Sequence, residues 1–78
     1  MEHGITIGML DAKIAEHPQD IALYIERGKL YYAADEFGKA MNDFMKARQL
    51  DPSSVEAEQY LRMINQILEF RYKDQFNP

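Results

Sequence analysis

The chain has 78 residues, 46% of them hydrophobic and 28% charged, so it is long enough for one domain with a modest core. Its 13 acidic and 9 basic side chains give a formal net charge of −4, which argues against a nucleic-acid partner and an anionic membrane surface. Cysteine is absent, which excludes disulfides and thiolate zinc sites, and no stretch approaches the ~18 apolar residues of a spanning helix.

Two helices are predicted in the first half of the chain. The first covers about Thr6 to Glu16, where apolar residues recur at helical spacing. Pro18 then interrupts the pattern, because proline cannot continue a helix and moves its predecessor out of the α region. The second helix runs from about Ile21 to Ala34, and Asp20 is expected to cap its N-terminus.

Two further helices are predicted in the second half. The third runs from about Phe37 to Leu50 and carries a single apolar stripe. Pro52 marks the next turn, and Ser53 with Glu56 three residues later has the spacing of a capping box. The fourth helix keeps its apolar period to about Lys73. No segment alternates with a two-residue period, so the predicted fold is all-α with four helices and short turns.

The offset from Pro18 to Pro52 is 34 residues, which is the period of one class of helical repeat. Small and aromatic residues are spaced between the prolines as that repeat requires. They are Tyr24, Gly28, Tyr31, Phe37, Ala40, Phe44 and Ala47, and Pro52 completes the pattern. This segment resembles a tetratricopeptide repeat (TPR), which implies antiparallel helical hairpins stacked as part of a right-handed superhelix.

The resemblance divides the chain into three parts. Residues 5–17 correspond to an N-terminal half-repeat helix, residues 20–52 to one complete repeat, and residues 53–75 to a long C-terminal capping helix. Arg27 stands where the family has leucine, which leaves a charge to be placed at the edge of the core. Gly28 lacks a Cβ, so the following helix is expected to approach closely at this point.

The resemblance also implies a small concave groove lined by the second and fourth helices. The residues predicted to line it are Ala22, Ile25, Glu26, Lys29, Tyr32, Gln59, Tyr60, Met63 and Ile67. In the family this surface holds a partner polypeptide, so the implied function is non-catalytic protein–protein interaction. The alternative is that Tyr32 and Tyr60 pack on each other and complete a small core.

A second function stands beside partner binding. Helical repeat arrays usually need about three repeats for stability, so two copies of this chain could complete an array by stacking their open ends. The aromatic residues near the C-terminus, Phe70, Tyr72 and Phe76, either return onto the third helix or contact a second chain. The partner is therefore another protein or peptide, with a homo-oligomer as the alternative.

Catalytic and metal chemistry have little support in the sequence. His3 and His17 are the histidines of the chain, and their spacing does not suit a pair of metal ligands on one helix. No catalytic residue, metal site or cofactor is predicted, and the chain is expected not to be an enzyme. The N-terminal ten residues lack a basic start and a long apolar run, so a cytoplasmic location is expected.

Overall fold

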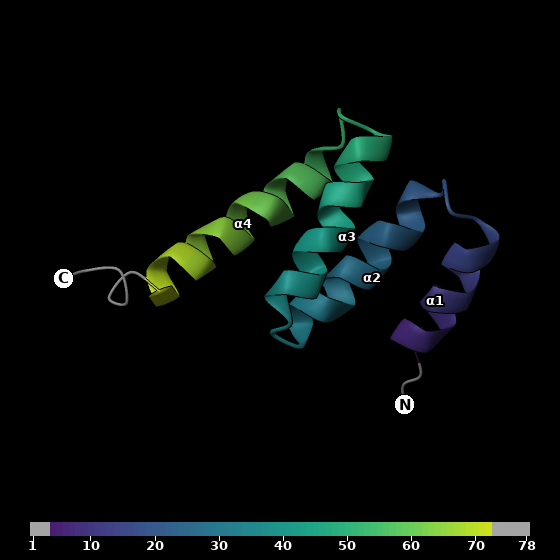
Figure 1. Ribbon diagram of the computed structural model, residues 1–78, viewed down its shortest axis with the longest axis horizontal. Coiled ribbons are helices and arrows are strands. Elements are labelled where there is room, and N and C mark those ends of the chain that lie inside the picture. The colour runs from purple at the N-terminus through teal and green to yellow at the C-terminus, as the bar shows by residue number, and fades with distance from the viewer. Residues whose placement is uncertain (1–3, 73–78) are drawn as a thin grey trace.

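Four α-helices follow one another in the computed structural model, which describes residues 4–72 (Figure 1). They are α1 (Ile7–Glu16), α2 (Ile21–Ala33), α3 (Phe37–Leu50) and α4 (Val55–Tyr72). No strand occurs within the described range, so the all-α prediction is confirmed. Residues 73–75, to which the fourth helix was predicted to extend, lie outside the described part of the chain.

Side chains cap the first two helices. The Thr6 hydroxyl accepts a hydrogen bond from the backbone N–H of Met9 at 3.2 Å. The Asp20 carboxylate accepts one from the N–H of Ala22 at 3.1 Å, which confirms the predicted cap of α2. Each bond satisfies one of the backbone donors that the first turn of a helix leaves without an intrahelical partner.

The predicted capping box at the start of α4 is wrong by one residue. The N–H of Ala57 donates to the hydroxyl of Ser54 at 3.2 Å, so Ser54 caps the helix. Ser53 instead donates its hydroxyl and its backbone N–H to Asp51, at 2.7 and 3.1 Å. Either of the two adjacent serines could cap α4. Because Ser53 is bonded to Asp51 in the turn, Ser54 is the one that caps the helix.

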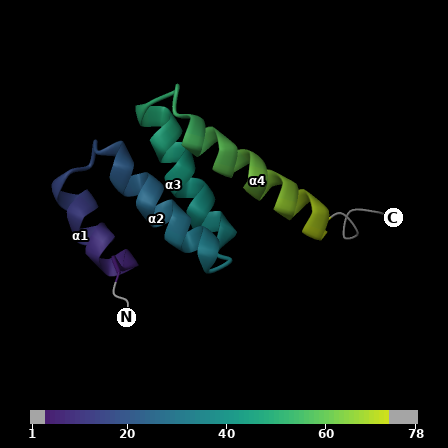
Figure 2. The same cartoon turned by 180° about the vertical axis from the view of Figure 1, so that it is seen from behind.

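α3 lies between α2 and α4, and α1 packs on the opposite side of α2 (Figure 1). The same order is seen from behind in Figure 2, where α4 diverges from α3 toward its C-terminal end. The core joins the three later helices. Its buried residues are Tyr24, Ile25, Phe37, Ala40, Phe44, Ala47, Ala57, Leu61 and Ile64.

Gly28 sets the distance between α2 and α3. A Cβ built on this glycine would lie 2.8 Å from Cζ of Phe44, closer than real Cβ contacts allow. Phe44 and Ala40 are fully buried at this contact. The predicted close approach is therefore present, and it depends on the missing side chain at Gly28.

Arg27 connects three helices. Its guanidinium donates two hydrogen bonds to the carboxylate of Asp43 on α3, at 2.7 and 2.9 Å, and one to Asp11 on α1, at 2.8 Å. The hydrogen bond to Asp43 is the main cause that raises the pKa of Arg27 above its ordinary value. Asp43 is the buried charged residue of the described core, and Arg27 supplies the positive charge that its burial requires.

Candidate functional site

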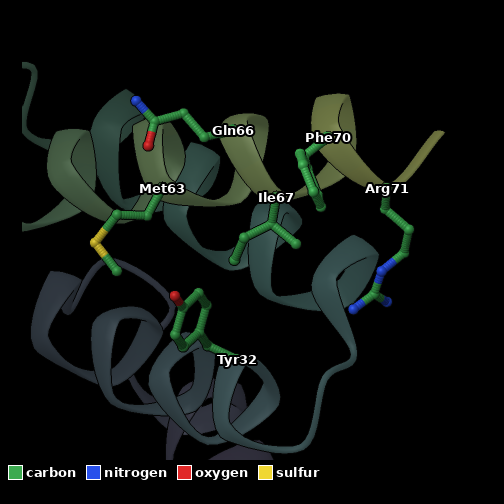
Figure 3. A pocket seen from close by; sticks show the side chains of 6 residues that line it. All are labelled: Tyr32, Met63, Gln66, Ile67, Phe70 and Arg71. Atoms are coloured by element: carbon green, nitrogen blue, oxygen red, sulfur yellow. The ribbon is translucent and has the colours of Figure 1, made fainter. Parts of the chain in front are cut away.

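The surface between α2 and α4 contains two hollows at opposite ends. The hollow beside the C-terminal ends of the two helices has a volume of about 490 Å³, and we call it the aromatic hollow. It is lined by Tyr32, Met63, Gln66, Ile67, Phe70 and Arg71 (Figure 3). The hollow beside their N-terminal ends measures about 350 Å³, and we call it the acidic hollow. It is lined by Ile21, Ala22, Ile25, Glu26, Lys29, Asp51, Ser54 and Glu56.

An aromatic cluster forms the wall behind the aromatic hollow. Tyr60 stacks on Phe44 with the ring centroids 4.6 Å apart and the planes 6° apart. Tyr32 meets Tyr60 edge to face at 5.2 Å and Phe37 at 5.5 Å. Tyr32 and Tyr60 therefore contact each other and the core, while Tyr32 also faces the hollow. Tyr32 and Tyr60 thus form the wall of the hollow, and each ring packs against another aromatic ring.

The rim of the aromatic hollow is apolar and accessible. Met63 and Ile67 project from α4 toward Tyr32 on α2, and Gln66 lies on the outer side of the helix (Figure 3). Met63 is 39% exposed and Phe70 is 84% exposed. Phe70 thus does not return onto α3, whereas the side chain of Tyr72 and all of Phe76 lie outside the described residues. An exposed phenylalanine beside an apolar hollow is a feature of binding surfaces.

Arg71 is the charged residue of the aromatic hollow. Its guanidinium carbon lies 5.5 Å from the centroid of the Phe37 ring, a distance at which a cation is attracted to an aromatic face. No carboxylate within residues 4–72 forms an ion pair with it. Arg71 is exposed at the edge of the hollow, and its guanidinium carries N–H donors that suit an anionic group.

Carboxylates surround the acidic hollow. Lys29 pairs with Glu56 at 3.3 Å, and the hydrogen bond from Lys29 to Glu56 is the main cause that raises the pKa of the lysine. Glu26 is exposed on the next turn of α2. Asp51 accepts two hydrogen bonds from Ser53, which lower its pKa and keep it ionised. With Lys29 neutralised by Glu56, the charge of this hollow is that of Glu26 and Asp51.

The structure distributes the predicted groove residues among three places. Ala22, Ile25, Glu26 and Lys29 line the acidic hollow, and Ile25 forms its buried base. Tyr32, Met63 and Ile67 line the aromatic hollow, with Tyr60 in the wall behind. Gln59 faces a separate hollow beside Pro52 and Arg62, so the structure does not bring it together with the others.

Sequence reasoning did not place Arg71 and Phe70 of the aromatic hollow, nor Ile21, Asp51 and Ser54 of the acidic hollow. Phe70 and Arg71 continue the stripe of Met63 and Ile67 by one helical turn, since 63, 67, 70 and 71 share one face. Extending the stripe would have found them. Phe70 was instead grouped with the aromatic residues near the C-terminus, and Arg71 was given no role, because the repeat pattern ends before them.

Other kinds of site are not indicated by the described residues. Between Gly4 and Arg71, no group of three or more histidine and acidic side chains is arranged to hold a metal ion. None of the four helices is both long enough and apolar enough to cross a bilayer. The described residues form a partly apolar surface between α2 and α4, with a positive charge at one end and negative charges at the other.

Comparisons with known proteins give no relative for this chain. No protein-family model, no curated protein and no solved structure matches it.

Proposed function

We propose that this chain is a non-catalytic interaction module that binds a segment of another polypeptide between α2 and α4. The observation that carries the proposal is the aromatic hollow, where the exposed side chains of Phe70 and Met63 lie beside the wall formed by Tyr32. Aromatic rings and methionine suit this role, because the first are large rigid anchors and the second adapts its shape.

The TPR resemblance is part of the same proposal. It is supported by the contact of Gly28 with Phe44 and by the complete burial of Ala40 and Ala47, which are residues of the repeat signature. In a TPR the first helices of successive repeats line the concave side. α2 and α4 would be those helices here, with α3 between them.

The proposal is tested by selecting binders from a displayed library of random 12-residue peptides and measuring their affinity by fluorescence anisotropy. Phe70→Glu and Met63→Glu should each weaken binding about ten-fold or more, because each places a charge in an apolar contact. Met45→Glu is the matched control, since Met45 is 46% exposed and lies on α3 in a different hollow. Circular dichroism checks that all three variants stay folded.

Selected peptides that bind Met45→Glu and Phe70→Glu equally would contradict the proposal. The same result would show that the aromatic hollow is not the contact surface. A library that yields no binder to the folded protein would also contradict it.

Self-association is the second candidate function, and the exposed ring of Phe70 is the observation that favours it. The outward face of α4 does not suit stacking, because Glu58, Arg62 and Asn65 are all exposed there. A second copy would therefore use the aromatic hollow. Light scattering over a dilution series should show a dimer that Phe70→Glu converts to a monomer, and a monomer at all concentrations would dismiss this candidate.

A further inference from the structure

We infer that the α2–α4 surface selects its partner by the order of charges along the bound segment, which we call charge polarity. The segment that fits has a carboxylate side chain next to an apolar anchor and a basic side chain about seven residues away. This inference rests on the proposed function, because it specifies the occupant of the same surface. It is carried by the opposite charges of the aromatic and acidic hollows.

The carboxylate is assigned to the aromatic hollow because of Arg71. Of the described residues that line this hollow, Arg71 alone is charged, and the Phe37 ring lies against it. A guanidinium presents N–H donors in a planar fork that matches a carboxylate.

The basic side chain is assigned to the acidic hollow. Lys29 is already paired with Glu56, so Glu26 and Asp51 remain as carboxylates facing that end of the surface. The chain also has a net charge of −4, which repels a purely acidic segment. A segment with charges of both signs satisfies Arg71 and avoids that repulsion.

The spacing follows from the geometry of α4. From Glu56 to Arg71 the helix rises by roughly 22 Å, at ~1.5 Å per residue. An extended peptide covers that distance in about seven residues, at ~3.3 Å each. The two hollows lie at the two ends of this length, with the Lys29–Glu56 pair at the acidic hollow and the Tyr32–Tyr60 contact beside the aromatic hollow.

Three labelled peptides test the inference. Each is acetylated and amidated, and each carries the same Leu-Phe anchor. The first peptide has two glutamates beside the anchor and two lysines about seven residues away. In the second peptide the glutamates and lysines are exchanged. The third peptide has glutamine at all four positions. The Leu-Phe anchor is expected to enter the aromatic hollow in all three peptides, so it decides which charges lie at each end. The comparison therefore does not depend on the N-to-C direction of the bound peptide.

The first peptide should bind about ten-fold more tightly than the second at low salt, with the glutamine peptide between them. The difference should fall to about two-fold at 0.5 M salt, because exposed charges are screened. Arg71→Glu should weaken the first peptide about five-fold and strengthen the second. Arg62→Glu is the matched control, since it makes the same charge change on the outward face of α4, where Arg62 is exposed.

Equal binding of the three peptides would overturn the charge polarity while leaving the binding surface in place. Equal effects of Arg62→Glu and Arg71→Glu would do the same, because bulk charge would then explain the preference. No binding by any peptide at 1 mM would overturn both proposals. A dimer that forms through Phe70 and excludes the peptides would assign the surface to a second copy and overturn this inference.

Discussion

The α2–α3 hairpin and the C-terminal half of α4 use similar residues in opposite ways. In the hairpin, Phe44 is completely buried because Gly28 leaves room for its ring. On α4, Phe70 is also a phenylalanine on a helix face, yet its side chain is almost fully exposed. The difference is the presence of a packing partner, since α2 and α3 lie against each other while the C-terminal end of α4 diverges from α3 (Figure 2). Stability therefore resides in the hairpin, and the end of α4 is available for contacts outside the chain.

The largest expected effect is at Phe44. Replacing it with alanine removes the ring at the centre of the hairpin and the surface on which Tyr60 stacks. A Phe→Ala change of this kind costs about 3–5 kcal/mol, which is comparable with the whole stability of a small domain. Urea titration followed by circular dichroism should show a largely unfolded protein in buffer. A midpoint close to that of the wild type would mean that the hairpin is not the stable region.

The next largest effect is expected at the ion pair between Arg27 on α2 and Asp43 on α3. Asp43→Asn leaves Arg27 without its main partner and should lower the free energy of unfolding by about 2–3 kcal/mol. Asp11→Asn is the control, because Asp11 contacts the same guanidinium from an exposed position and should change stability by less than about 1 kcal/mol. Equal losses in the two variants, measured by thermal unfolding, would show that burial of Asp43 is unimportant.

Smaller effects, of opposite sign on the free energy of unfolding, are expected when Gly28 and Gly38 are replaced by alanine. Gly28→Ala puts a Cβ against Phe44 and should destabilise the protein by about 1–2 kcal/mol, despite the better helix propensity of alanine. Gly38→Ala meets no atom within 4 Å and should stabilise α3 by about 0.5–1 kcal/mol. Chemical denaturation of both variants measures the contrast. Stabilisation by both alanines would show that the contact between α2 and α3 is loose.

The smallest effect on stability is expected at the end of α4. Phe70→Ser removes an exposed ring and should change the melting midpoint by no more than the equivalent of about 0.5 kcal/mol. The same variant should lose affinity for peptides, so stability and binding separate at this residue. A large loss of stability would place Phe70 in the core and remove the contrast with the hairpin.

Much of the fold could be predicted because local signals agreed with one another. Pro18 and Pro52 marked the turns, Asp20 marked the start of α2, and the spacing of Gly28 and Phe44 identified the close contact. The cap of α4 was predicted at Ser53 but lies at Ser54, because either serine could serve and the hydrogen bonds of Asp51 decided between them. Boundaries of this kind depend on one or two hydrogen bonds that periodicity does not reveal.

The sequence by itself determined the helices, their order and the residues at the centre of the hairpin. Helical period, proline and glycine act within a few residues, so they can be read along the chain. The tertiary structure alone decided that Arg27 joins α1, α2 and α3, and that Tyr60 stacks on Phe44. It also placed Arg71 against Phe37 and separated the groove into an aromatic and an acidic hollow. These features depend on distances between helices remote in sequence, which are set by packing and not by local pattern.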